Sequence, residues 1–209
     1  MRKFLLLFII LFSCNIDNEK EEKNKYQILS LLYDRLAQPT DPVFPPPPPD
    51  SLNYVFTSKD SARINSTIEK FIKERDGRRQ IVAIYPQLNP YIGGSRKERG
   101  KDCSEYDEAI NKLISLKDSL KIDIDKIITR RNDSIIYFKK ELLDEYSRDF
   151  YKFDALISFS RVAFNEDFMK AVVVGSISHS KLAGVSVLYF LEKINDTWEV
   201  RCTKELSIS

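Results

Sequence analysis

Four β-rich runs in the last third of the chain constrain its fold more than any other feature. The runs cover residues 155–164, 169–177, 184–193 and 198–206. The links between them are short and polar, for example Asn195-Asp196. Links this short join antiparallel neighbours, because parallel pairing needs a connection of about a dozen residues or more. The sequence therefore predicts a C-terminal antiparallel β-meander of about four strands.

The middle strands of this meander carry apolar side chains on both faces. In the run 184–193, one face holds Val185, Val187, Tyr189 and Leu191, and the other face holds Leu188 and Phe190. The segment 172–174 is valine throughout and is apolar on both faces as well. Strands of this composition are covered on both sides. We therefore expect a layer on each face of the sheet, one of them formed by the upstream helices.

The upstream part of the chain predicts helices and short strands. Apolar side chains at helical spacing predict helices over 26–37, 58–74, 104–116 and 140–149. Short apolar runs predict strands at 81–85 and 134–138. The expected fold is therefore α+β, with N-terminal helices and a short strand packed on the C-terminal meander.

The first fourteen residues combine cations, an apolar run and a cysteine. Arg2 and Lys3 precede the unbroken apolar run 4–12, and Ser13 and Cys14 follow it. This run is far shorter than the roughly 20 residues that a membrane-spanning helix needs, and its order is typical of a secretory signal. Its last residues, Leu11-Phe12-Ser13-Cys14, resemble the lipobox of bacterial lipoproteins.

The resemblance to bacterial lipoproteins implies an address for the chain. In that family the signal is cut before the cysteine, whose thiol and new amino group are then acylated. It implies a signal peptide over 1–13, a lipid anchor at Cys14 and a place in the cell envelope. Asn15, in place of the aspartate that retains many such proteins at the inner membrane, favours the outer membrane. The alternative is a plain secretory signal that leaves a free cysteine beside the cut.

The segments after Cys14 are expected to form a tether. Residues 15–25 are charged and nearly without apolar side chains, which predicts a solvated linker. Five prolines at 45–49 predict an extended polyproline spacer. The expected organisation has three parts. Residues 1–13 form a signal peptide, residues 14–50 form a lipid-anchored tether that contains a short helix and the polyproline spacer, and residues 51–209 form one α+β domain.

Composition excludes some classes of function. The formal net charge of +2 comes from Arg2 and Lys3, so the remaining chain has no basic footprint for a nucleic acid. The chain has one histidine and no Cys/His cluster with metal-binding spacing, so neither a metal nor a cofactor is expected. Cys103 and Cys202 leave two interpretations open. An exported protein can join them in a disulfide, but the alternation of residues favours Cys202 as a buried thiol beside Trp198.

No catalytic constellation can be named from the sequence, and the candidate ligand-binding residues are Arg161 and His179. His179 stands between two serines that strand geometry would turn away from it, so we interpret it as a polar turn residue. Arg161 interrupts an apolar strand, and its guanidinium either pairs with a carboxylate across the sheet or offers a fork to an anionic ligand.

A second resemblance covers about residues 150–209. The residues that carry it are 158–167, 170–174 and 189–193, together with Trp198. This pattern is similar to that of a group of uncharacterised secreted bacterial proteins, and it implies no activity. The function expected is that of a non-enzymatic binding module in the envelope, whose partner is another envelope protein or a small ligand. The alternative is an enzyme with an unrecognised site, such as a hydrolase of envelope polymers.

Overall fold

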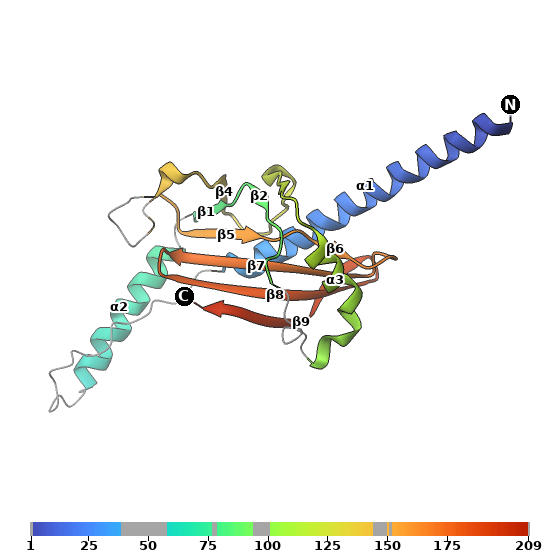
Figure 1. Ribbon diagram of the computed structural model, residues 1–209. Coiled ribbons are helices and arrows are strands. Elements are labelled where there is room, and N and C mark those ends of the chain that lie inside the picture. Colours follow the sequence, from blue (N-terminus) through green and yellow to red (C-terminus); the bar gives the residue numbers. More distant parts are fainter. Residues whose placement is uncertain are drawn as a thin grey trace.

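A mixed β-sheet with helices on both of its faces organises the chain (Figure 1). The structure is a computed structural model. It describes residues 2–38, 58–76, 79–93, 101–143, 150 and 152–208, and in the first helix it describes side chains from Asn18 onward. Helix α1 (Arg2–Leu36) packs on one face of the sheet and helix α3 (Asp107–Ser115) on the other. The predicted α+β class is confirmed.

The C-terminal strands form the antiparallel meander that the sequence predicts. They are β5 (Ala155–Phe159), β6 (Ala163–Phe164), β7 (Lys170–Ser180), β8 (Ala183–Ile194) and β9 (Thr197–Ile208). The strands β8 and β9 are joined by Asn195 and Asp196, with φ angles of 48° and 63°. Positive φ at both turn residues matches the right-handed twist of a hairpin, which explains the choice of asparagine and aspartate here.

The sheet is larger than four strands and is not purely antiparallel. Strand β1 (Ile81–Ile84) lies between β5 and β4 (Ser134–Tyr137) and is parallel to both. The seven-stranded sheet has the order β4-β1-β5-β7-β8-β9, with β6 paired to β7. Parallel pairing is possible because the long connection from β1 to β4, which contains α3, crosses over the sheet. A separate ladder joins β2 (Gln87–Leu88) to β3 (Leu120–Lys121).

Both faces of the meander are buried, as its alternation predicts. Tyr189 and Leu191 belong to the core that α1 covers. Leu188 and Phe190 belong to the core that α3 covers, where the ring of Tyr106 packs edge-on against Phe190 with centroids 5.4 Å apart. Alternate residues of β8 therefore face two different helical layers.

Helix α1 corrects the expectation of a solvated linker. Its face formed by Ile28, Leu29, Leu32 and Tyr33 is fully buried, so the helix predicted over 26–37 is confirmed and is part of the core. The helix also extends back through the charged segment, where Asn24 is 1 % and Lys25 is 7 % exposed. That segment has no proline or glycine to stop the helix, and adding residues to an existing helix is far easier than starting one.

The other predicted helices are found in part. Helix α2 (Ser58–Asp76) matches its predicted range, and α3 follows a 3-10 segment, η2 (Lys101–Tyr106). Instead of a helix over 140–149, the described residues contain a short 3-10 turn, η4 (Lys140–Leu142). The polyproline run at 45–49 lies outside the described residues.

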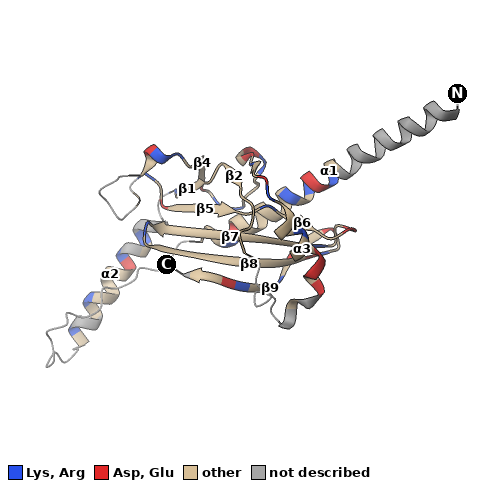
Figure 2. Cartoon of the chain, viewed as in Figure 1, with Lys and Arg blue, Asp and Glu red and all other residues tan. Residues whose placement is uncertain are grey.

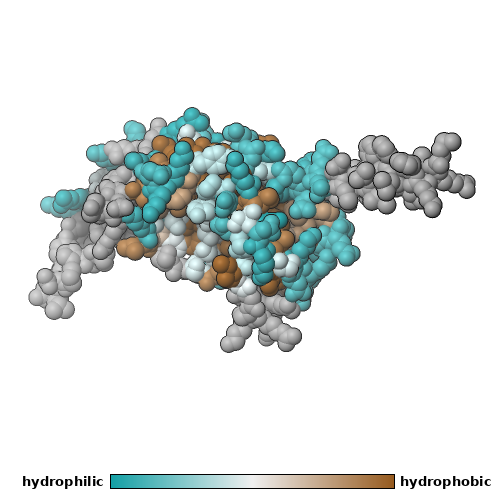
Figure 3. All heavy atoms as spheres, turned by 45° about the horizontal axis from the view of Figure 1, so that its top comes forward, coloured by the Kyte–Doolittle hydropathy of each residue, from teal (hydrophilic) through white to brown (hydrophobic). Residues whose placement is uncertain are grey.

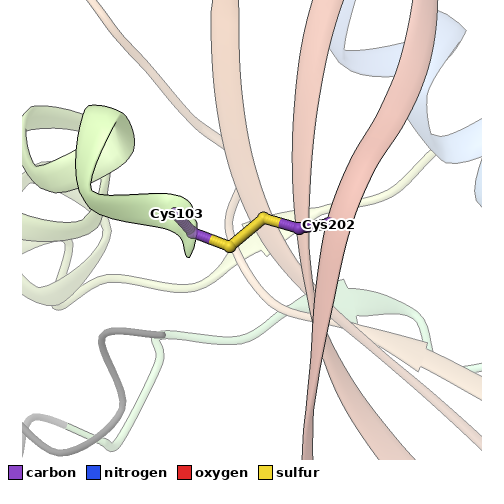
Figure 4. Close-up of a disulfide and its surroundings, with 2 residues drawn as sticks. All are labelled: Cys103 and Cys202. Carbon is purple, nitrogen blue, oxygen red and sulfur yellow. A yellow bond between two sulfur atoms is a disulfide. The ribbon is translucent and has the colours of Figure 1, made fainter. Parts of the chain in front are cut away.

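A disulfide joins Cys103 of η2 to Cys202 of β9 (Figure 4). The interpretation of Cys202 as a buried free thiol is therefore wrong, because the layer containing η2 brings Cys103 to this strand. The bridge spans a sequence separation of 99 residues. It fastens η2, and the α3 that follows, to the sheet.

Replacing both Cys103 and Cys202 with serine should lower the free energy of unfolding by about 2–5 kcal/mol, because the closed loop restricts the unfolded chain. Urea unfolding of the two proteins measures this difference. The Cys14→Ser variant is the matched control and should unfold as the unaltered protein does. If Cys14→Ser lowered the free energy of unfolding as much as the double variant does, the stabilising role of the bridge would be contradicted.

Candidate functional site

One polar face of α1 is bound along its length by the segment 122–133. Glu22, Tyr26, Ser30 and Asp34 follow one another at intervals of four residues, so they form a single row on the helix. Each of them contacts this segment, which contains the 3-10 turn η3 (Ile124–Lys126). The helix is therefore held on two sides, by the sheet on its apolar face and by this segment on its polar row.

The contacts of the row are specific hydrogen bonds. The backbone N–H of Asp123 donates to Tyr26 Oη at 2.8 Å, and that of Ile128 donates to Ser30 Oγ at 2.9 Å. The hydroxyl of Thr129 donates to the Asp34 carboxylate at 2.5 Å. Side chains of α1 thus accept hydrogen bonds from two backbone N–H groups and one hydroxyl of the segment 122–133.

A buried ionic cluster closes the C-terminal end of this interface. The Asp133 carboxylate, whose side chain is 5 % exposed, accepts from Tyr33 Oη at 3.1 Å and from Arg131 Nε at 2.6 Å. Burial and the neighbouring Asp133 charge both raise the pKa of Tyr33, so its hydroxyl keeps its proton and donates it to this bond. Arg131 also donates to Gln80 at 3.0 Å, which links α1 to the start of β1.

At the opposite end of the interface, α1 leaves the domain between three separate elements. Lys20 lies over the ring of Phe168, with Nζ 4.9 Å from its centroid, in the turn between β6 and β7. Trp198 Nε1, at the start of β9, donates to Asn24 Oδ1 at 3.2 Å, and Lys126 of η3 pairs with Glu22 at 3.2 Å. We call these three contacts the collar.

Charges at the collar are paired across the elements. Burial opposes ionisation of Glu22, but hydrogen bonds from Lys25 and Lys126 outweigh it and lower the pKa of this carboxyl. Lys25, whose side chain is 9 % exposed, therefore retains a partner for its charge within the domain. In Figure 2 this part of the α1 ribbon carries both basic (blue) and acidic (red) residues.

Arg161 is paired with a carboxylate, although not across the sheet. Its Nη1 donates to the Asp118 carboxylate at 2.8 Å and to the Asp118 carbonyl at 3.1 Å. Asp118 lies in the loop that follows α3, so the guanidinium fastens this loop to the end of β5. The Arg161 side chain is 13 % exposed, whereas that of Asp118 is 77 % exposed.

His179 lies within β7 and is not a turn residue. Its neighbours Ser178 and Ser180 pair with Gly184 and Ala183, and the register shifts between them, so His179 occupies a bulge. The turn of this hairpin is formed instead by Lys181 and Leu182. Burial lowers the pKa of His179, while a hydrogen bond to the backbone of Asp154 and the Asp154 charge oppose this effect.

The two candidate ligand-binding residues do not form one site. His179 is next to Ser178, which pairs with Leu156 near the start of β5, and Arg161 follows the end of that strand. Arg161 lies five positions after Leu156, which corresponds to about 16 Å of extended chain. A role in ligand binding for either residue stays a prediction. In the part of the chain that the structure describes, no group of three or more His, Cys, Asp or Glu residues is placed to hold a metal ion.

Sequence reasoning missed the row on α1 and the collar. The signal was the spacing of Glu22, Tyr26, Ser30 and Asp34, which places four hydrogen-bonding side chains on one face. A solvated helix face has the same pattern, so only the position of the segment 122–133 distinguishes the two.

Comparisons of the chain with protein-family models, with curated proteins and with solved structures find no match. Among the described residues, none of the helices has an apolar stretch long enough to cross a membrane.

Replacing Asp133 with alanine should lower the free energy of unfolding by about 3 kcal/mol, because it leaves Tyr33 and Arg131 without their buried partner. Urea unfolding measures the loss. Asp125→Ala, in the same segment but exposed, is the matched control and should change the free energy by about 0.5 kcal/mol or less. Equal losses of unfolding free energy in the two variants would contradict the contribution of the buried cluster to stability.

His179→Gln should remove a pH dependence of stability. The pKa of His179 is lower in the folded protein than in the unfolded chain, so the unfolded chain takes up the proton first. Stability should be complete above the unfolded value of about 6.5 and should fall as the pH drops below it. Urea unfolding at pH 7.5 and pH 5.5 should show this loss in the unaltered protein and a smaller one in the variant. If the variant lost as much stability between pH 7.5 and pH 5.5 as the unaltered protein, the assignment of this pH dependence to His179 would be contradicted.

Proposed function

We propose that this chain is a lipoprotein of the bacterial cell envelope, anchored through acylated Cys14, most consistent with the outer membrane, and that its α+β domain acts as a non-enzymatic binding module. The support from sequence is the order of cations, apolar run, Ser13 and Cys14. The observation that carries the proposal is the pairing of the other two cysteines.

The disulfide between Cys103 and Cys202 supports export and assigns the cysteines different tasks. Disulfides form and persist in oxidising compartments outside the cytoplasm, where a secretory signal would deliver the chain. Cys14 is the third cysteine of the chain and is not part of this bridge. It is therefore available for acylation, and several acyl chains on one residue hold a protein firmly at a membrane.

The engagement of these charged side chains within the domain supports a structural role for them over a catalytic one. The Arg161 guanidinium is already paired with Asp118, and Asp133 with Arg131. Paired groups of this kind stabilise loops and layers. The partner is then a second envelope protein or a small ligand, recognised by the outer surface of the domain. Figure 3 shows hydrophilic and hydrophobic side chains interspersed over one face of that surface.

The anchor can be tested by expressing the full precursor in a diderm bacterium and measuring the mass of the N-terminal peptide from isolated membranes. We expect a chain that begins at Cys14 and carries acyl groups. Cys14→Ser should appear as uncleaved precursor or as soluble protein. The matched control, Cys103→Ser with Cys202→Ser, should stay anchored although it lacks the bridge. Firm membrane association of a correctly cleaved Cys14→Ser protein would refute the proposal.

A further inference from the structure

Helix α1 connects Cys14 to the core of the domain without a break. Lys20, the first residue of the collar, lies only six positions after Cys14, which corresponds to about 9 Å of helix. A flexible coil between Cys14 and Lys20 would instead have an average extension of about 13 Å and no fixed direction. The helix therefore sets the direction as well as the distance from the anchor to the domain.

The collar holds α1 from opposite sides. Residues two apart on a helix point about 200° away from each other, so Glu22 faces nearly opposite to Lys20 and Asn24. Their partners lie in η3, in the turn between β6 and β7, and at the start of β9. The helix also has its apolar face in the core and its polar row bound by the segment 122–133. These contacts fix its direction relative to the sheet.

We propose that α1 is a rigid stalk that holds the collar end of the domain against the phospholipid headgroups. This inference rests on the proposed acylation of Cys14. The headgroup layer is about 5–7 Å thick on each side of a bilayer, so an end of the domain about 9 Å from the anchor lies at its outer surface. The turns 165–169 and 195–196 are the parts of the meander at this end (Figure 1).

The surface of the collar end suits this place. Met169, in the turn before β7, is 44 % exposed and can rest at the boundary of the headgroups. The charges there are of both signs, with Lys20 beside Asp167 and Lys193 paired with Asp196 at 2.6 Å. Since neither sign dominates, the orientation arises from the stalk and should be the same on neutral and on anionic vesicles.

Trp198 is the natural probe of this arrangement, because it is the only tryptophan of the chain and belongs to the collar. The opposite end of the sheet is marked by the turn at Lys181, and strand β7 between the two ends has 11 residues. A strand of that length spans about 36 Å. Energy transfer from tryptophan to a headgroup label falls steeply over such a distance.

The experiment uses the acylated full chain in vesicles of phosphatidylethanolamine and phosphatidylglycerol that contain a dansyl-labelled headgroup. Lys181→Trp adds a second tryptophan at the far end and leaves Trp198 in the collar. Transfer from Trp198, measured in the unaltered protein, should be several-fold more efficient than transfer from the added tryptophan, obtained as the difference between the two proteins. Equal transfer from the two positions would overturn the stalk. Vesicles without phosphatidylglycerol should give the same ratio of the two transfer efficiencies. A ratio that falls to about one in those vesicles would overturn the stalk in favour of charge-driven docking.

Two insertions between Asp17 and Asn18 test rigidity without altering the domain. Seven glycine and serine residues should free the domain and reduce transfer from Trp198. Seven helix-forming residues, the matched control, should lengthen the stalk by about 10 Å and preserve the difference between the two tryptophan positions. If the glycine and serine insertion leaves transfer from Trp198 unchanged, the stalk is refuted.

The mass of the N-terminal peptide distinguishes the two proposals. An acylated Cys14 with equal transfer from both positions would refute the stalk and leave the lipoprotein proposal intact. A chain without acyl groups on Cys14 would refute both.

Discussion

The burial of α1 against the sheet is the interaction on which the rest of the structure depends. Ile28, Leu29 and Leu32 are each fully buried, and burial of one such side chain contributes about 1.5–3 kcal/mol. They belong to one hydrophobic core with residues of β1, β5, β7 and β8, so strands that are distant in sequence share one hydrophobic layer. Without α1 this face of the mixed sheet would be exposed to water, whereas the opposite face would still have α3.

The polar row on α1 adds specificity to this packing. Apolar contacts alone allow a helix to slide or rotate on a sheet, because the hydrophobic effect is not directional. The hydrogen bonds of Tyr26, Ser30 and Asp34 require one register between helix and segment 122–133. A shift by one residue would break these hydrogen bonds, at a net cost of about 0.5–1.5 kcal/mol each. The row therefore determines where along the helix the domain sits.

The features of the fold that depend on local residue patterns are predictable from the sequence. The features that depend on contacts between distant segments are not. The valines at 172–174 and the Asn195-Asp196 turn identify the meander, because side-chain alternation and turn geometry are local properties. The parallel place of β1 was not predictable, since its short apolar run fits any strand neighbour. The same limit applies to the Cys103–Cys202 bridge, which requires the layer containing α3 to lie over β9. The charged residues before Tyr26 fit a solvated linker until Lys126 and Trp198 are placed beside them.

If Cys14 is acylated as proposed, the continuity of α1 makes the orientation of the domain on the membrane depend on the fold, whereas attachment does not depend on it. Attachment would depend on the acyl groups of Cys14 alone, so an unfolded domain would remain at the membrane. Orientation would depend on the core, because only the folded sheet and the collar fix the direction of the helix. A destabilising substitution such as loss of Asp133 would then release the orientation before it releases the protein. In the proposed lipoprotein, the same helix would thus couple the stability of the domain to its position on the membrane.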